Sequence, residues 1–556
     1  MIKMNNMVWQ PDEFIVETDE LKDIIFDQSS LSILAGPGAG KTEMLAQKSV
    51  FLFENGLCPW PKKILFLTFK TEASKNVNDR VVKRNLNVRD RFVSRTYHAF
   101  AKTIIDRYRM SLEESIRPNV GYDIIFKGKS TRDKVNINDI IPYAMRILKK
   151  NQKVMRLFRE SYSHVFMDEF QDTTLLQYGL VSSIFWGTTA KVIFVGDLNQ
   201  SIMLWAEADP EIYNRAEKEF RPERKLLVSN FRANENIKKF LDVFMPFVAK
   251  GEISSGYVNF NDSCSLHNFN DDLQEADFLA EYIKLKVDSG YSPKEICVLT
   301  KQKSVDYSKK LCERLNSKNI SNIVYDSFQD AISEPLGIIF LLILECVLIR
   351  SPKAWSSLIA LYQELHVMDL HNTKDQYKLQ EFIEYFSVNK KEVKCQNVDE
   401  IIKFINSIIK KINFKKVKSR WPQYKSKEFT NFIWKELTNQ LKAVFPFTVD
   451  NKNLVEKFSG SNSVQIMNIH KCKGLEYKLV ILLGFEDEAF WSYSDQSFEQ
   501  RCVLYVAFTR AKEEILVTQS STRECISSGK TPLTTKRIDL VSKFMMRACG
   551  MRYIKH

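Results

Sequence analysis

The segment Ala35-Gly36-Pro37-Gly38-Ala39-Gly40-Lys41-Thr42 carries the residue types that a phosphate-binding loop needs. Glycines let backbone amides close around phosphate oxygens, and the N-terminus of a following helix adds a favourable dipole. Lys41 is placed to reach the outer phosphates, and the Thr42 hydroxyl is placed to ligate Mg²⁺. A chance glycine turn is the alternative. The apolar residues on both sides favour the loop, so the sequence predicts a nucleoside triphosphate site formed by Gly36, Gly38, Ala39, Gly40, Lys41 and Thr42.

Two carboxylates, Asp168 and Glu169, directly follow the apolar run from His164 to Met167. A strand that ends on such a pair is what a P-loop ATPase needs beside its phosphate loop. Asp168 would hold Mg²⁺, partly through water, and Glu169 would polarise the attacking water. The pair is common after strands, but a phosphate loop earlier in the same chain favours the catalytic interpretation.

Short apolar runs alternate with helical patterns, and these elements must position the chemical groups. We predict strands in the runs 64–69, 164–167, 191–195, 296–300 and 479–483. Strands that alternate with helices form parallel sheets covered by helices on both faces. The runs cluster before about residue 250 and after about residue 265, which predicts two α/β cores.

The chain has 556 residues and a net charge of +13, from 81 Lys+Arg against 68 Asp+Glu. This length predicts about three or four domains. The positive balance favours a polyanionic partner, although solubility alone would also explain it. Nine Lys/Arg and no Asp/Glu lie between Lys403 and Lys427, interleaved with aromatic residues. That stretch is either a surface for a duplex backbone or a solvated helix face.

Ten cysteines are scattered without a CxxC pair or a zinc-like spacing, which favours reduced thiols. The N-terminus lacks the apolar core of a signal peptide. The longest apolar run, Leu336 to Ile349, is interrupted by Glu345 and is short for a bilayer, so we interpret it as a buried helix. We therefore expect a cytoplasmic protein without a membrane segment.

Further segments resemble, in order, the motifs of superfamily 1 helicases of the UvrD/Rep/PcrA group. Besides the phosphate loop and the run Asp168 to Thr173, the matching segments are Leu67–Ser74, Thr96–Phe100, Val195–Ile202 followed by Trp205, Asn230–Ala233, Val464–Glu476 and Tyr505–Lys512. Ordered matches over nearly the whole chain are far more specific than any single one. The resemblance implies an α/β fold with two RecA-like P-loop domains, each with a parallel sheet and a mostly helical insertion.

The resemblance also assigns residues to an ATP site. It implies that Gln200 senses the γ-phosphate and the attacking water, and that Arg232 and Arg510 are arginine fingers. Phe231 would stack on the adenine, and Glu476 would hydrogen-bond the ribose. An isolated arginine would by default form a surface ion pair. Arg510 belongs to the second core, so the resemblance implies that domain closure is coupled to hydrolysis.

A second set of residues falls at or beside family positions that contact single-stranded nucleic acid: Phe69, Tyr97, His98, Trp205 and His470. Aromatic faces can stack on any base. Packing inside a core is the alternative for each aromatic residue, above all for Phe69 and Tyr97.

Two positions depart from the family pattern. Glu43 stands where the family often has an arginine beside the adenine, and no convincing adenine-reading glutamine precedes the phosphate loop. Glu72 occupies a usually basic position in the first DNA-contacting segment. The sequence therefore leaves base recognition open.

The resemblance and the strand pattern together predict six segments. They are RecA-like domain 1 in two parts (1–95 and 161–260) around a helical insertion (96–160), and RecA-like domain 2 in two parts (261–345 and 456–556) around a helical, basic insertion (346–455).

Two functions fit these observations. The first is an ATP-dependent translocase that moves along single-stranded DNA, 3′ to 5′ by resemblance, and unwinds duplex at single-strand/duplex junctions. The second is a nucleic-acid-activated ATPase that serves a partner nuclease or other effector with little unwinding, as in UvrD-like subunits of antiphage systems such as Gabija. A non-motor P-loop ATPase would be insensitive to nucleic acid.

Overall fold

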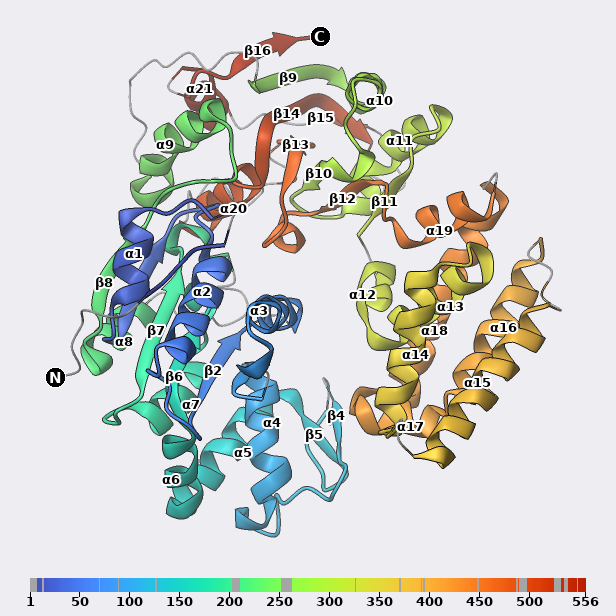
Figure 1. Cartoon of the computed structure of the whole chain (residues 1–556). Helices are drawn as coiled ribbons and strands as arrows, with labels where there is room; N and C mark the ends of the chain where they lie inside the picture. The colour runs from blue at the N-terminus through green and yellow to red at the C-terminus, as the bar shows by residue number, and fades with distance from the viewer. Residues whose placement is uncertain are drawn as a thin grey trace. The chain divides into compact units, whose positions relative to one another are not determined.

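A computed structural model describes residues 8–12, 15–69, 71–88, 90–125, 128–202, 211–251, 263–325, 327–369, 372–391, 393, 396–447, 450–486, 489, 498–524, 532–534, 539–547 and 549–556 (Figure 1). The chain forms two compact units. The first comprises residues 1–254 and 494–509, and the second comprises residues 255–493 and 510–556.

The first unit is built on a six-stranded sheet in which every strand pair is parallel. The strand order is β3 (Phe92–Thr96), β2 (Lys63–Thr68), β6 (Tyr162–Met167), β7 (Lys191–Gly196), β1 (Leu31–Ala35) and β8 (Glu223–Leu227). The predicted strand runs in this part of the chain coincide with β2, β6 and β7. The parallel sheet expected for the first core is confirmed.

Alternation along each strand divides the core of this unit between the two faces of the sheet. In β2, Ile64 and Phe66 face one core, while Leu65 and Leu67 face the other. The first core is covered by α1 (Asp19–Phe26), α2 (Lys41–Glu54) and α3 (Thr71–Arg84). The second is covered by α4 (Tyr97–Tyr108), α5 (Ile137–Lys150), α6 (Gln152–Ser161), α7 (Leu175–Phe185) and α8 (Ile212–Phe220).

The segment between β3 and β6 is mostly helical. It consists of α4, α5 and α6, with the short parallel pair β4 (Asp123–Ile125) and β5 (Lys134–Asn136). Thr96 caps α4 by accepting a hydrogen bond from Ala99 N at 3.2 Å.

Helix α20 (Phe498–Phe508) packs in the first unit, although it lies between two strands of the second unit in the chain. The Phe508 ring lies 5.3 Å from Phe240 and 5.2 Å from Phe244, both on α9 (Glu235–Lys250). Arg501 Nε donates to Val248 O at 3.0 Å. An apolar face and an arginine together hold α20 on α9.

The second unit contains a larger sheet with the order β11 (Asn322–Val324), β12 (Val464–Asn468), β10 (Ile296–Thr300), β13 (Tyr477–Leu482), β14 (Ala511–Glu524), β9 (Cys264–Asp271) and β16 (Arg552–Lys555). These pairs are parallel, and β15 (Pro532–Thr534) pairs antiparallel with β14. Helices α10 (Asp272–Asp288) and α11 (Ser304–Ser317) cover one face. Helix α21 (Asp539–Arg547) precedes β16.

The inserted part of the second unit is helical and has its own apolar core. Its helices are α12 (Ser327–Ser333), α13 (Pro335–Leu348), α14 (Pro352–His366), α15 (Thr373–Lys391), α16 (Val398–Lys411), α17 (Phe414–Arg420), α18 (Lys427–Val444) and α19 (Asn451–Ser459). Helix α13 begins with Pro335 at its first turn and is buried in this core, which confirms the predicted buried helix.

No single helix among the described residues is long and apolar enough to cross a membrane. Helices α12 and α13 reach the required length and apolar composition only when they are taken together, and the pair is bent by 79°.

Lys48 is a buried charge that joins α1 to α2. Its side chain is 1% exposed, and its Nζ donates to three carbonyls at the end of α1, those of Ile24 at 2.8 Å, Ile25 at 3.3 Å and Asp27 at 2.7 Å. Burial lowers the pKa of Lys48 to about 8, so the ammonium still predominates at neutral pH. These bonds satisfy carbonyls that a helix end leaves without internal partners.

Substituting Lys48→Met should lower the free energy of unfolding by about 2–3 kcal/mol, because buried carbonyls lose a charged donor. Denaturant titration of the purified protein measures the change. Lys22→Met, which removes an exposed lysine of α1 that pairs with Glu17, is the control and should change little. Equal stability of the Lys48 variant and wild type would show that these bonds do not hold α1.

Candidate functional site

The phosphate loop follows β1 and opens α2, as the sequence predicts. Gly40 is the N-cap of α2 with φ 77°, and Gly38 has φ 70°, a region that L side chains rarely adopt. Gly36 N donates to Leu227 O at the end of β8 at 2.9 Å, which fixes the start of the loop. The loop therefore sits at the carboxyl edge of the sheet, where open α/β sheets bind ligands.

The segment Asn230–Ala233 closes over the phosphate loop. Phe231 N donates to Gly38 O at 3.1 Å, and Asn230 Oδ1 accepts from Arg232 N at 2.9 Å and Ala233 N at 3.2 Å. A Cβ on Gly38 would collide with Asn230 Oδ1 and would lie 2.7 Å from the Cβ of Arg232. Glycine is thus required at position 38 for two reasons: the backbone conformation is left-handed, and the covering segment leaves no room for a side chain.

The two predicted carboxylates follow β6 at the same edge. Asp168 N donates to Leu67 O at 3.0 Å, and Asp168 Oδ1 accepts from Glu169 N at 3.0 Å. Glu169 has φ 49° and ψ 45°, a left-handed conformation that is uncommon outside glycine and asparagine. Such residues cluster at functional sites, where the surroundings hold them in place.

A chain of hydrogen bonds joins Glu169 to Gln200 through two intermediate residues. Gln171 Nε2 donates to Glu169 Oε2 at 2.6 Å, and Gln171 Oε1 accepts from Asp197 N at 3.1 Å. Gln200 Nε2 then donates to Asp197 Oδ2 at 2.7 Å. Gln171, Asp197 and Gln200 are buried, so this chain is shielded from water. It connects the ends of β6 and β7.

Lys41 and Asp197 interact electrostatically in this site. Burial raises the pKa of Asp197, and the nearby Lys41 ammonium and the bond from Gln200 oppose that rise. The charge of Lys41, the residue predicted to reach outer phosphates, therefore acts on Asp197, a member of the Glu169–Gln171–Asp197–Gln200 chain.

A Mg²⁺ ion at the loop would be held largely by phosphate and water. No group of three or more His, Cys, Asp or Glu arranged for a metal occurs within the described residues. Mg²⁺ commonly uses one or two protein ligands beside substrate phosphates. Thr42, in the first turn of α2, and Asp168 are the residues that would provide them.

The two predicted arginine fingers have different surroundings. Arg232 Nη1 donates to Thr509 O at 2.9 Å within the first unit. Arg510, the next residue in the chain, belongs to the second unit, where it is 2% exposed and its Nη1 contacts Leu475 O at 3.4 Å. Glu476 is exposed and pairs with Lys512 at 2.5 Å. Phe231 is 51% exposed, as a side chain available for stacking must be.

The aromatic residues predicted to contact nucleic acid differ in how exposed their side chains are. Phe69 directly follows β2 and is 38% exposed, whereas Tyr97 is 2% exposed, and its hydroxyl lies 3.3 Å from Thr173 Oγ1. Tyr97 is thus a core residue, the alternative that its sequence leaves open. Trp205 lies outside the described residues.

The two candidate histidines are partly buried. Burial, with Lys301 and Lys473 nearby, lowers the pKa of His470 to about 4, and its Nδ1 lies 2.8 Å from Asn468 Oδ1. Burial also lowers the pKa of His98. Both rings are therefore neutral near pH 7 and are suited to stacking or neutral hydrogen bonds with nucleic acid.

Glu43 is engaged by two arginines of α3. Its carboxylate pairs with Arg80 at 2.5 Å and Arg84 at 2.6 Å, and it also accepts from Gln47 Nε2 at 3.1 Å. Glu43 therefore ties α2 to α3, and no role in base recognition follows from this geometry.

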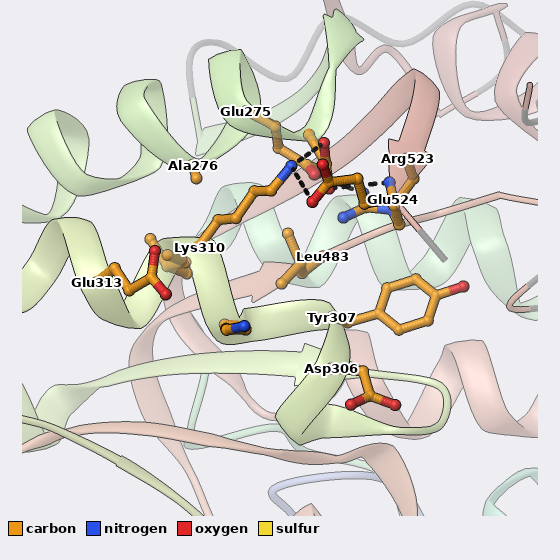
Figure 2. Close-up of a pocket in the computed structure, with 12 residues that line it drawn as sticks. Glu275, Ala276, Asp306, Tyr307, Lys310, Glu313, Leu483, Arg523 and Glu524 are labelled. Atoms are coloured by element: carbon orange, nitrogen blue, oxygen red, sulfur yellow. Dashed lines mark hydrogen bonds and ion pairs between the residues drawn. The ribbon is translucent and has the colours of Figure 1, made fainter. Parts of the chain in front are cut away.

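The second unit contains a separate polar cavity of about 150 Å³ between α10 and α11 (Figure 2). Arg523 donates to Glu486 Oε2 at 3.0 Å and to Glu275 Oε2 at 2.5 Å, and all three residues are buried. Lys310 pairs with Asp272 at 2.9 Å and Glu524 at 3.1 Å. These ion pairs link the end of β14 to the two helices, and no residue predicted for the ATP or nucleic-acid site lines the cavity.

Sequence reasoning did not assign roles to Gln171 and Asn230, although both lie within matched segments. Both are polar residues inside those segments, but only their contacts with Glu169 and Gly38 reveal what they do. Tyr213, which lies beside Gln171, is outside every motif and carries no such signal.

The chain is similar to two domains of one helicase family. Residues 16–123 and 117–221 match the UvrD/REP helicase N-terminal domain, and residues 226–329 and 349–522 match the UvrD-like helicase C-terminal domain.

Individual relatives are similar over most of their length. A probable DNA helicase II homolog of Mycoplasma capricolum is 23% identical, over 90% of this chain and 85% of the relative. The ATP-dependent DNA helicase PcrA of Staphylococcus epidermidis is 21% identical, over 92% and 84%. The putative ATP-dependent DNA helicase YjcD of Bacillus subtilis is 21% identical, over 93% and 80%.

Gly38→Ala should reduce nucleotide affinity by about tenfold, because the new Cβ would displace the segment that covers the phosphate loop. Gly56→Ala is the matched control: Gly56 has φ 69°, and its Cβ would meet nothing within 4 Å. Both variants carry the same left-handed strain, of about 1–2 kcal/mol. Titration with a fluorescent nucleotide separates the two effects, and equal affinities in the two variants would contradict the steric argument.

Proposed function

The chain belongs to the UvrD/REP helicase family, and from this premise we propose that it is an ATP-driven motor that translocates along single-stranded DNA and unwinds duplex, moving 3′ to 5′. The observation that carries the proposal is the hydrogen-bond chain from Glu169 through Gln171 and Asp197 to Gln200. It joins a candidate catalytic base to a candidate phosphate sensor beside Lys41.

Each residue of the proposed ATP site has a chemical role. The backbone of the phosphate loop and Lys41 bind the phosphates, and Glu169 orients the attacking water and accepts its proton. Gln200 detects the γ-phosphate, and Arg232 and Arg510 neutralise charge on the transferring phosphoryl group. Phe231 stacks on the base, and Glu476 binds the ribose. Mg²⁺, held by Thr42 and Asp168, would supply charge neutralisation on the phosphates.

The carboxyl edge of the first sheet supports coupling between ATP and DNA. Phe69 follows β2, and His98 lies in the first turn of α4 after β3, so both are at the edge that also bears the phosphate loop. In the second unit, His470 follows β12 in a short helical turn capped by Asn468. We propose Phe69, His98, Trp205 and His470 as contacts to single-stranded DNA, with neutral side chains that stack on bases.

The basic stretch 403–427 splits into an apolar and a cationic part. Phe404 and Tyr424 are buried in the helical core, and Phe414 and Trp421 pack against it. The interleaved aromatic residues are therefore structural. Lys410, Lys415 and Lys416 are exposed, and within the described chain no ion pair involves them. We propose that these three lysines contact the phosphates of duplex DNA ahead of the motor.

Lys41→Ala and Glu169→Gln should each lower ATP turnover at least about 100-fold, because one removes phosphate binding and the other removes the base. Lys22→Ala and Glu281→Gln, both at exposed surface positions, are the matched controls and should retain turnover. ATPase assays with single-stranded DNA, duplex DNA and RNA make the measurement. Normal turnover in either site variant would refute the assignment.

The same proteins should be assayed for unwinding of a tailed duplex. Strand separation would support the helicase. The polarity of the single-stranded tail that permits unwinding would give the direction of movement. Stimulation of ATPase by single strands without unwinding would instead favour the nucleic-acid-activated ATPase that serves a partner nuclease. ATP turnover that is unchanged by nucleic acid would exclude both the helicase and the nucleic-acid-activated ATPase.

Removing the charges of Lys410, Lys415 and Lys416 together should flatten the salt dependence of binding to duplex DNA. Each lost phosphate contact reduces the slope of log K against log salt by about 0.9. The control replaces Lys284, Lys378 and Lys452, which already pair with acidic residues. A slope equal to that of the control would identify the three lysines as a solvated face.

A further inference from the structure

Tyr213 places a buried hydroxyl at the proposed catalytic site without a hydrogen-bond partner among the described residues. It lies in the first turn of α8 and is 6% exposed. Its ring packs edge-on against Phe170, with the ring centroids 4.8 Å apart. Buried polar groups without partners are rare in native proteins and call for an explanation.

The surroundings of this hydroxyl are rich in acceptors. A Cβ built on Gly196 would collide with both the Tyr213 hydroxyl and Gln171 Oε1, so these two oxygens lie close to the same point. Burial and the carboxylates of Asp197 and Glu169 hold the pKa of Tyr213 well above its ordinary value. The hydroxyl therefore keeps its proton and can donate it in a hydrogen bond.

Gln171 Oε1 has the capacity to accept that bond. A carboxamide oxygen has two lone-pair directions, and among the described residues Gln171 Oε1 accepts one bond, from Asp197 N. The other end of the same carboxamide donates to Glu169. A bond from Tyr213 would therefore fix the orientation of the group that holds Glu169.

We propose that Tyr213 is a positioning residue that reports the triphosphate state: its hydroxyl bonds Gln171 Oε1 when a nucleoside triphosphate occupies the phosphate loop, and it is unpaired without one. The inference rests on the proposed ATP site. Gln200, the proposed γ-phosphate sensor, donates to Asp197 Oδ2, and Asp197 N donates to Gln171 Oε1, so a γ-phosphate acts on the same chain of residues to which Gln171 belongs. A diphosphate lacks the group that would trigger the bond.

A bond formed only in the triphosphate state must increase affinity for triphosphate alone. Tyr213→Phe removes the hydroxyl but keeps the ring packed on Phe170. It should weaken binding of a non-hydrolysable ATP analogue by about 5-fold and leave ADP affinity within about twofold. The melting temperature of the nucleotide-free variant should equal or exceed that of wild type, because an unpaired buried hydroxyl is lost. Calorimetric titration and thermal unfolding provide these readouts.

Tyr178→Phe is the matched control. Tyr178 is another buried tyrosine of the same core, and its hydroxyl donates to Glu219 Oε2 at 2.7 Å. Its variant should lose stability and keep both nucleotide affinities. Each substitution deletes one phenolic oxygen. Tyr213→Phe should lower affinity for the ATP analogue without loss of stability, whereas Tyr178→Phe should lower stability without loss of affinity.

A double-mutant cycle tests whether Tyr213 acts through Gln171. In a Gln171→Ala background, Tyr213→Phe should cause no further loss of affinity for the ATP analogue. Additive losses would overturn the inference, as would equal weakening of ADP and the analogue, or unchanged affinity for both. None of these readouts depends on hydrolysis. Failure of DNA to stimulate hydrolysis in wild type would instead refute the proposed function.

Discussion

Crowding at the carboxyl ends of β6 and β7 is the constraint on which the proposed ATP site depends. Gly196 ends β7 at a point where a Cβ would meet Gln171 Oε1 and the Tyr213 hydroxyl. Because no side chain separates them, Gln171 can bond Glu169 with one atom and Asp197 N with another. The left-handed backbone of Glu169 is retained within this network. The absence of a Cβ at Gly196 thus permits the contact between the ends of β6 and β7.

A similar constraint governs the phosphate loop. Gly38 has no room for a side chain because Asn230 and Arg232 cover it, and β8 supplies the carbonyl that anchors Gly36. Parallel strands bring all these segments to one edge of the sheet, although they are distant in sequence. The second unit is held differently, since buried Arg523 joins Glu275 and Glu486 where β14 ends. Removing one partner there would leave a buried charge uncompensated.

Several features could be predicted from the sequence because they depend on local pattern. The alternation in β2, the Pro335 start of α13 and the loop at Gly38 and Gly40 each follow from residues close together in the chain. Aromatic residues could not be sorted in this way. Phe69 is exposed and Tyr97 is buried, yet both are single aromatic residues beside a strand end, and the difference depends on what packs above them. Within 403–427, Phe404 and Tyr424 are core residues, and Phe414 and Trp421 pack against that core.

The sequence by itself determined the family and the parallel α/β character, and it predicted which residues are offered to a nucleotide. These follow from ordered motifs and hydrophobic periods, which short-range chemistry imposes on the chain. Only the tertiary structure decided that Gln171 links Glu169 to Asp197 and that α20 packs on α9. It also decided that the Tyr213 hydroxyl, without a hydrogen-bond partner among the described residues, lies near Gln171 Oε1. Such relations join residues far apart in the chain, and the packing of side chains between strands and helices, which no local pattern encodes, creates them.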